Sequence, residues 1–327
     1  MKAHLQIIDR ILDAIREAKT ICIVGHMRPD GDCIGSQLGL MLALRAEGKK
    51  AVAWNQDSVP AKYRFLDPDK DFERPKSGEQ FDLVIATDCA SYERLGSVVE
   101  FIKERKLLIN IDHHESNTRY GDLNWVSPRE ASTGELIHRL LKAARWPITK
   151  PIADLLFTAV STDTGSFQYP NTRPGTFHVG AELVTRGANL AKICDEVYQS
   201  FPLSRARLLK LVYNKFKLTH NDRIAYFWLK KADLSRTGAE TNDTEGLIDH
   251  IRAIEPVVVA CVFEEIEPDL TRISLRSKSK DVNVSEICGQ FGGGGHPAAA
   301  GARIAGSPMS IQRRVVAAIK KAINAAK

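Results

Sequence analysis

The pattern of apolar and polar positions divides the first half of the chain into alternating strands and helices. Short apolar runs predict strands at residues 21–25, 51–54, 81–87 and 107–111. Helical spacing of apolar residues predicts helices at 34–47 and 130–144. This alternation is typical of a mainly parallel sheet that is covered on both faces. We therefore expect an α/β fold with a doubly wound N-terminal domain over residues 1–187.

Other helices are predicted in the same half. Residues 5–15 carry apolar side chains on one helical face, but charged residues interrupt them, so the segment is neither a signal peptide nor a membrane span. The spacing over 152–160 predicts a buried helix that stops at Ser161, and a helix over 175–186 is expected to end at Gly187. Ser132 and Glu135 have the spacing of a capping box before the 130–144 helix.

The second half has a different pattern. Residues 188–215 are polar and helical, and we interpret them as a connector. Strand-like runs follow at 224–229, 257–264 and 272–276, with a helix at 244–254. Ser307 and Pro308 form a good start for a last helix, along which Ile311, Val315, Ile319 and Ile323 make one apolar stripe. Residues 216–327 are therefore expected to form a smaller mixed α/β domain.

Composition and charge narrow the class of partner. The 46 basic and 40 acidic residues give a formal charge of +6, a mild excess that suits a small phosphorylated partner at least as well as a long nucleic acid. No segment approaches the roughly 18 apolar residues that a membrane helix needs. Six cysteines lack CxxC spacing, which is compatible with a reducing cytoplasm. We expect a cytoplasmic protein that has no membrane partner.

Aspartates and histidines gather in four clusters, of which three directly follow predicted strands. Ligands of an open parallel sheet bind in the crevice that the loops at the carboxyl ends of its strands share. The clusters are therefore expected to converge in space. They are His26, Asp30 and Asp32 after the first strand, Asp88 after the third, Asp112, His113 and His114 after the fourth, and Asp163 where the buried helix ends.

Such a crevice predicts bound metal ions. Carboxylates that lie close together cannot all ionise without a compensating cation. Two divalent ions would neutralise four of them, and two ions about 3.5–4 Å apart form the usual clamp for phosphoryl transfer. Histidines argue against an all-oxygen magnesium site, and the aspartate majority argues against a closed zinc site. Mn²⁺ is the expected ion, with other first-row ions left open. Each cluster alone is explained by a turn or a helix cap, but their joint occurrence is not.

In this order the clusters resemble the four motifs of the DHH phosphoesterase superfamily, including the literal Asp112-His113-His114. The match covers most of residues 20–170. The resemblance implies two domains that face each other across a cleft, and a metal-bridging hydroxide as the nucleophile. It also implies roles for single residues: His26, Asp30 and Asp88 bind one ion, Asp88 bridges to an ion held by Asp32, His113 and Asp163, His114 faces the substrate phosphate, and Asp112 orients its neighbours.

The most distinctive stretch of the second half is glycine-rich. Residues 292–295 are consecutive glycines, which leave backbone N–H groups open to an anion, although a flexible linker is an alternative. The stretch 291–301 resembles the GGGHxxAAG signature of the DHH-associated C-terminal domain, and residues 274–277 resemble its basic substrate-contacting strand. The resemblance implies substrate contacts from Arg276, Ser277, Gly293, Gly294, Gly295 and His296.

Comparison within the superfamily suggests a substrate. The chain lacks the Ser-Arg-Lys-Lys-Gln signature of family-II pyrophosphatases, the extra modules of RecJ-like exonucleases and the membrane segments of membrane-bound cyclic-di-AMP hydrolases. It then resembles the nanoRNases, which implies a hydrolase of short RNA to mononucleotides and of 3′-phosphoadenosine 5′-phosphate (pAp) to AMP.

Other substrates and another class of protein stay open at this point. A phosphodiesterase of c-di-AMP, pApA or pGpG is one alternative. A pyrophosphatase and a non-catalytic nucleotide-binding protein are two more. The expected partner is a short RNA or a phosphorylated nucleotide. Both polarities of RNA degradation stay open, as do a monomer and a homodimer.

Overall fold

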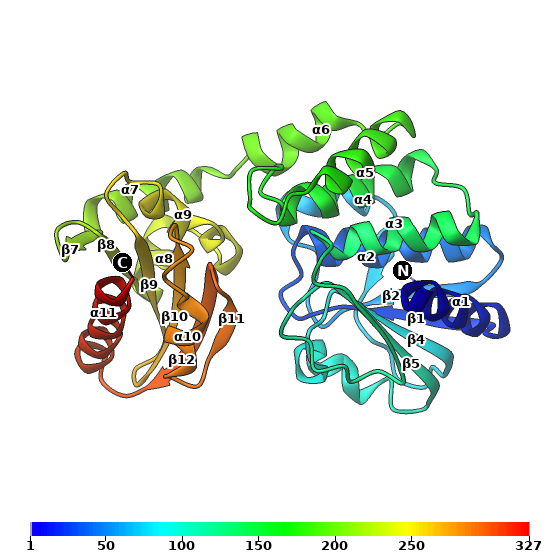
Figure 1. The fold of residues 1–327 in the computed structure, drawn as a ribbon, viewed down its shortest axis with the longest axis horizontal. Coiled ribbons are helices and arrows are strands. Elements are labelled where there is room, and N and C mark those ends of the chain that lie inside the picture. Colours follow the sequence, from blue (N-terminus) through cyan, green and yellow to red (C-terminus); the bar gives the residue numbers. More distant parts are fainter. Residues whose placement is uncertain (1, 327) are drawn as a thin grey trace. The chain divides into compact units, whose positions relative to one another are not determined.

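The computed structural model describes residues 2–326, apart from the side chains of residues 2–5 and 242. The chain divides into two compact units, Met1–Ser200 and Phe201–Lys327 (Figure 1). The division falls inside the segment 188–215 that we interpreted as a connector. Its first part forms α6 (Leu190–Cys194) and a π-helical turn, η3 (Asp195–Gln199), in the first unit, and its last part forms α7 (Leu203–Lys215) in the second.

The first unit is built on a six-stranded parallel sheet in the order β3-β2-β1-β4-β5-β6. The four strands expected from apolar runs are confirmed, whereas the short strands β3 and β6 at the edges were not predicted. Chain order reverses between β1 and β4, so the carboxyl ends of these two strands flank the topological switch point where ligands of such sheets bind. The strands are β1 (Thr20–Val24), β2 (Lys50–Trp54), β3 (Phe72–Glu73), β4 (Phe81–Thr87), β5 (Arg105–Asp112) and β6 (Leu123–Val126).

Helices cover both faces of this sheet, as expected for a doubly wound domain. Ile21, Ile23 and Ile85 point to one face and share a core with the long helices α1 to α4. Cys22, Val24 and Val84 point to the other face and pack with the 3₁₀ helix η2. The helices of this unit are α1 (Lys2–Glu17), α2 (Gly31–Ala46), η1 (Ala61–Leu66), η2 (Tyr92–Glu100), α3 (Thr133–Ala144), α4 (Lys150–Asp163) and α5 (Pro174–Thr185).

The ends of two helices differ from the predictions. The helix expected to stop at Ser161 continues to Asp163, which is therefore the last residue of α4. Only half of the expected capping box forms at α3. The Ser132 hydroxyl accepts the Glu135 N–H at 3.2 Å, but the Glu135 carboxylate accepts the N–H of Ala131 rather than that of Ser132.

The second unit contains a mixed six-stranded sheet in the order β11-β12-β10-β9-β8-β7, in which β8 and β9 are parallel and the other pairs antiparallel. Its strands are β7 (Lys217–Thr219), β8 (Ile224–Leu229), β9 (Val259–Glu267), β10 (Leu270–Ser277), β11 (Gly294–His296) and β12 (Ala299–Ala305). Its further helices are α8 (Lys231–Thr237), η4 (Thr241–Thr244), α9 (Leu247–Arg252), α10 (Val284–Gly289) and α11 (Pro308–Ala325).

Helices α10 and α11 cover one face of this sheet, and the four apolar residues predicted along the last helix are buried there. Ser307 precedes α11 but makes no side-chain capping bond. The glycine-rich stretch is not a flexible linker, since residues 294–296 form the edge strand β11 on β12. Among the described residues, no helix is long and apolar enough to span a membrane.

Candidate metal centre

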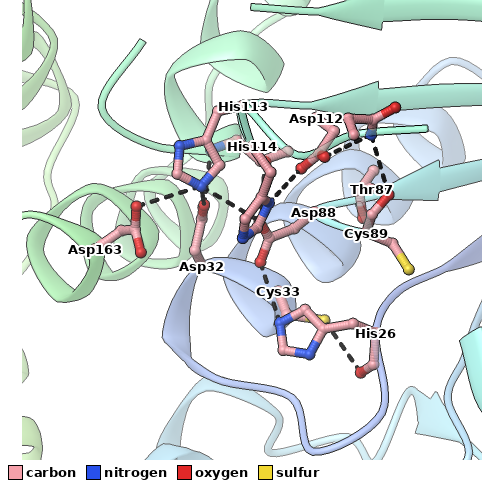
Figure 2. Close-up of polar contacts among 12 residues, drawn as sticks. His26, Asp32, Cys33, Thr87, Asp88, Cys89, Asp112, His113, His114 and Asp163 are labelled. Atoms are coloured by element: carbon pink, nitrogen blue, oxygen red, sulfur yellow. Dashed lines mark hydrogen bonds and ion pairs between the residues drawn. The ribbon is translucent and has the colours of Figure 1, made fainter. Parts of the chain in front are cut away.

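The clusters that are distant in sequence meet at the carboxyl ends of β1, β4 and β5 (Figure 2). His26 Nε2 lies 3.4 Å from Asp88 Oδ2 and 3.7 Å from Asp30 Oδ1. His113 Nε2 lies 3.3 Å from Asp163 Oδ2 and 3.8 Å from Asp32 Oδ2. The structure thus brings together all six side chains that the sequence analysis proposed as metal ligands.

His26 presents one ring nitrogen to two carboxylates. Its Nδ1 lies 2.9 Å from the Met27 carbonyl oxygen. A carbonyl only accepts hydrogen bonds, so Nδ1 carries the proton and Nε2 faces Asp30 and Asp88. Burial lowers the pKa of His26, but hydrogen bonds and charge from Asp30 and Asp88 outweigh it and raise the pKa to about 10. The carboxylates therefore favour a positive charge at Nε2, either a proton or a metal ion.

A second set of donors surrounds His113. Burial and the Asp88 charge outweigh the charge of His113 and raise the pKa of Asp163 to about 7. Burial, followed by the charges of Asp88 and Asp163, raises the pKa of Asp32 well above its ordinary value. Without a cation these carboxyl groups tend to keep a proton at neutral pH, because their negative charges repel each other in a buried site.

Asp88 lies between the two sets. Its Oδ2 faces His26 Nε2, while its Oδ1 lies 3.6 Å from His113 Nε2 and 3.7 Å from His114 Nδ1. Burial raises the pKa of Asp88, but the three histidines outweigh it and hold the pKa well below its usual range. Asp88 has a left-handed backbone, with φ of 53°, which is uncommon for a residue other than glycine. A carboxylate with each oxygen directed to a different group is suited to bridging two cations.

The N-terminus of α3 holds Asp32. Asp32 Oδ2 accepts the Thr133 N–H at 2.7 Å, and Oδ1 accepts the Gly134 N–H at 2.8 Å. The Thr133 hydroxyl also donates to Asp88 Oδ1 at 3.2 Å. A helix N-terminus stabilises negative charge, so these bonds fix a carboxylate that burial disfavours. The sequence analysis missed Thr133 and Gly134, although the capping spacing of residues 132–135 marks the helix start that carries them.

Asp112 orients His114, the neighbour of His113. Asp112 Oδ1 accepts from His114 Nδ1 at 2.8 Å, and Asp112 Oδ2 accepts from Asn117 Nδ2 at 2.6 Å. Burial lowers the pKa of His114, but Asp112 and Asp88 outweigh it and raise the pKa to about 9. Asp112 is fully buried, so the pair is held firmly. Asn117 was also missed, because an asparagine in a loop carries no signal of its own.

The donor sets suit divalent cations. Among the described side chains, three groups have ligand atoms within 4.8 Å of one another: His26, Cys33 and Asp88; Asp88, His113 and His114; and Asp32, His113 and Asp163. Nitrogen and carboxylate oxygen are ligands of first-row divalent ions. The group around His26 contains Cys33 where the resemblance implied Asp30. Asp30 Oδ1, which lies 3.7 Å from His26 Nε2, also accepts the N–H groups of Asp32 and Cys33 and so caps α2.

The predicted substrate contacts other than His114 lie in the second unit. Arg276 on β10 and His296 on β11 both pair with Ala299 on β12, so the three residues form a row on one face of the sheet. Arg276 and His296 are two strand spacings apart, which is roughly 10 Å. Ser277 points to the opposite face, where its buried hydroxyl bonds to the backbone of Ser279. The structure therefore does not bring Ser277 together with Arg276 and His296.

The glycine backbone is less open than expected. The Gly293 N–H donates to the Cys288 carbonyl at 2.9 Å. Gly294 and Gly295 pair with Gly301 and Ala300 of β12. In an antiparallel pair only some N–H groups of the edge strand point away from the partner. The Gly293 N–H is thus already hydrogen-bonded, so N–H groups for an anion have to come from the outer edge of β11.

Comparison with known proteins agrees with both units. Residues 20–160 match the DHH family, N-terminal domain, and residues 221–327 match the DHHA1 domain. The chain is 33% identical to the bifunctional oligoribonuclease and PAP phosphatase NrnA of Thermus thermophilus, over 98% of this chain and 95% of that protein. It is 31% identical to the probable enzyme of the same name from Streptococcus mutans, over 89% and 92% of the two chains.

A solved structure is similar over the whole chain. The crystal structure of an exopolyphosphatase-related protein from Bacteroides fragilis is 26% identical, with a TM-score of 0.87 over 98% of this chain and 96% of that one. Each matched domain lies within one of the two compact units, and the matched DHH segment includes every residue of the candidate metal centre except Asp163. The chain therefore belongs to the DHH family, with an N-terminal DHH domain followed by a DHHA1 domain.

Proposed function

We propose that this protein is a two-metal phosphoesterase that hydrolyses very short RNA to mononucleotides and pAp to AMP. The position of Asp88 carries the proposal, because its two oxygens face two separate sets of metal donors. The names of the Thermus and Streptococcus relatives support the substrates. We further propose that the enzyme acts in the cytoplasm.

The contacts support two ligand sets. His26, Asp30 and Asp88 would hold one divalent ion, and Asp32, Asp88, His113 and Asp163 would hold the other. The mixture of imidazole and carboxylate favours Mn²⁺ over Mg²⁺. When bound, two such ions supply Lewis acidity that activates water and neutralises charge on the phosphoryl group.

The remaining residues orient these groups and the substrate. The α3 N-terminus directs both oxygens of Asp32, and Asp112 holds His114 so that its ring contacts the phosphate under attack. Arg276 and His296, which lie in one row on the sheet of the second unit, would bind a phosphate or the 3′ end of a short nucleotide chain, as the resemblance implies.

One parallel assay tests the proposal. Purified protein with Mn²⁺ is given pAp, RNA of two to five nucleotides, pApA, pGpG, c-di-AMP and pyrophosphate. We expect AMP from pAp and mononucleotides from short RNA, each with a higher kcat/KM than the other substrates. A preference for c-di-AMP or pyrophosphate would overturn the substrate assignment, and tight nucleotide binding without turnover across several metals would indicate a non-catalytic protein.

Divalent ions are expected to stabilise the fold. The carboxyl groups of Asp32 and Asp163 are disfavoured as anions in the metal-free site, so binding relieves their repulsion only in the folded state. Free Mn²⁺ at a hundred times its Kd should add about 2.7 kcal/mol, or about 5–10 °C in Tm. Differential scanning fluorimetry with EDTA and with a Mn²⁺ series measures the shift. An unchanged Tm across the series would contradict the metal centre.

Arg276→Gln is expected to raise KM for pAp and dinucleotides by about 10- to 100-fold and to leave kcat almost unchanged. A charge-assisted hydrogen bond contributes roughly 1.5–3 kcal/mol, and here it would bind a phosphate that does not react. Arg313→Gln is the matched control, since Arg313 is an exposed arginine on α11. Steady-state kinetics of both variants decide the point. Equal kinetics of the two variants would remove Arg276 from the substrate site.

A further inference from the structure

The loop between β1 and α2 is fixed by hydrogen bonds at successive peptide groups. In the His26–Met27 peptide group, the His26 carbonyl accepts from Asn55 Nδ2 at 3.1 Å and the Met27 N–H donates to the Arg94 carbonyl at 2.7 Å. In the next peptide group, Met27–Arg28, the Met27 carbonyl accepts from His26 Nδ1 at 2.9 Å and the Arg28 N–H donates to Asp57 Oδ2 at 2.7 Å. Both peptide groups are therefore bonded at both ends.

The second peptide group connects a carboxylate to the histidine ring. The chain of contacts runs from Asp57 Oδ2 to the Arg28 N–H, across the amide to the Met27 carbonyl, and on to His26 Nδ1. An anion that accepts the N–H of an amide polarises that amide and makes its carbonyl a stronger acceptor. The negative charge of Asp57 is thus transmitted to the side of His26 that faces away from Asp30 and Asp88.

The fold fixes the position of Asp57. Its own N–H donates to Asn55 Oδ1 at 3.0 Å, just after β2. Asn55 and Gln37 are fully buried, and Gln37 Nε2 donates at 3.1 Å to the carbonyls of both Ile23 on β1 and Trp54 on β2. The carboxyl ends of the two strands are therefore tied together beneath the loop. Arg28 has φ of 56°, a left-handed conformation that needs such support in a non-glycine residue.

We propose that Asp57 is a positioning residue of the metal centre, which acts through the Met27–Arg28 peptide to hold the Nδ1 proton of His26, so that Nε2 faces Asp30 and Asp88 and offers its lone pair when a metal ion takes the place of the proton there. Metal-binding histidines commonly donate their second N–H to a carboxylate or a carbonyl. Here the Met27 carbonyl accepts the bond, and the Asp57 carboxylate binds the N–H of the same peptide group. The inference rests on the proposed function only in taking His26 as a metal ligand.

Two substitutions separate the hydrogen bond from the charge. Asp57→Ala removes both, and we expect it to weaken binding of the ion held by His26 by about 10- to 100-fold, the usual effect of losing a partner of a metal-binding histidine. Asp57→Asn keeps an oxygen that can accept the Arg28 N–H but loses the charge, so its loss should be smaller. The ion held by Asp32, His113 and Asp163 should bind as in the wild type.

Asp67→Ala is the matched control. The Asp67 carboxylate also accepts two backbone N–H groups in a loop of the same unit, those of Asp71 at 2.7 Å and Phe72 at 3.3 Å. It lies in the loop that leads to β3, whereas Asp57 lies in the loop that follows β2. A general loss of loop order would affect both alanine variants alike, while the proposed role affects only Asp57.

The experiment uses the full chain and two measurements. Titration with Mn²⁺, followed by the electron paramagnetic resonance signal of the free ion, counts the bound ions and gives their affinities. In metal-free protein, ¹H–¹⁵N NMR of the imidazole groups follows the Nδ1 proton of His26. We expect a slowly exchanging Nδ1 proton in the wild type and in Asp67→Ala, a faster exchange in Asp57→Asn, and loss of the signal in Asp57→Ala.

The outcomes separate this inference from the proposed function. Wild-type Mn²⁺ affinities and an unchanged His26 Nδ1 signal in Asp57→Ala would overturn the role of Asp57, whatever the enzyme hydrolyses. If the wild type binds Mn²⁺ but cleaves none of the assayed substrates, the proposed function fails and the binding and NMR data still decide on Asp57. Should Asp57→Ala not fold, Asp57→Asn decides: the same affinities and exchange rate as the wild type would overturn the proposal.

Discussion

Asp88→Asn is expected to reduce hydrolysis of pAp and of short RNA by at least about a thousandfold, equivalent to about 4 kcal/mol of activation free energy. Asp88 is the side chain with one oxygen facing His26 and the other facing His113 and His114. Asparagine preserves the shape but removes the negative charge that both donor sets share. Both metal ions should then bind more weakly, and turnover measured at saturating Mn²⁺ should remain low.

Asparagine is preferable to alanine at this position. Residue 88 has φ of 53°, and asparagine and aspartate tolerate that conformation better than other side chains. Asp82→Asn is the matched control, because Asp82 lies near the start of the same strand and its carboxylate binds Thr20 and Lys106 at the opposite end of β4. Circular dichroism verifies the fold of both variants. Turnover of Asp88→Asn close to that of Asp82→Asn would exclude Asp88 from the metal centre.

The convergence of the aspartates and histidines could be predicted from the sequence because they follow strong local signals. A buried strand such as β4 is a continuous apolar run, and the polar residue that ends it, Asp88, is easy to recognise. Parallel strands place such ends at one edge of the sheet, so Asp88 and His113 were expected to be close although 25 positions separate them (113 − 88). Asp163 follows no strand, and it was included because it lies where the predicted buried helix ends and matches the fourth motif of the resemblance.

The groups that hold these donors could not be predicted in this way. Thr133 and Asn117 act through backbone or amide contacts with residues that are distant in sequence or in another element. Asp57 reaches His26 only through a peptide group, and no residue pattern encodes that path. The resemblance did not say which side of the sheet Ser277 faces: adjacent residues of a strand face opposite sides, so its side chain lies on the side opposite to Arg276.

The close packing of α2 against α4 determines the positions of two proposed ligands. Asp32 lies in the first turn of α2, and Asp163 is the last residue of α4. Between these ends the helices approach at Gly35, where an added Cβ would lie 2.4 Å from the Leu155 carbonyl oxygen and 2.9 Å from the Ala159 Cβ. The first of these contacts is with the backbone, so a rotamer change cannot relieve it.

Gly35→Ala is therefore expected to destabilise the protein by about 3 kcal/mol, at the upper end of the usual cost of overpacking, even though alanine favours helices by about 1 kcal/mol. Thermal unfolding followed by circular dichroism should show a Tm lower by roughly 6–12 °C.

Gly39→Ala, one turn further along α2, is the control. There the nearest atom is the end of the Leu156 side chain at 3.0 Å, which can move. The gain in helix propensity then offsets the crowding, and Tm should stay within about 3 °C of the wild type. Equal stabilities of the two variants would show that α2 and α4 can separate at Gly35, and that their spacing does not fix Asp32 relative to Asp163.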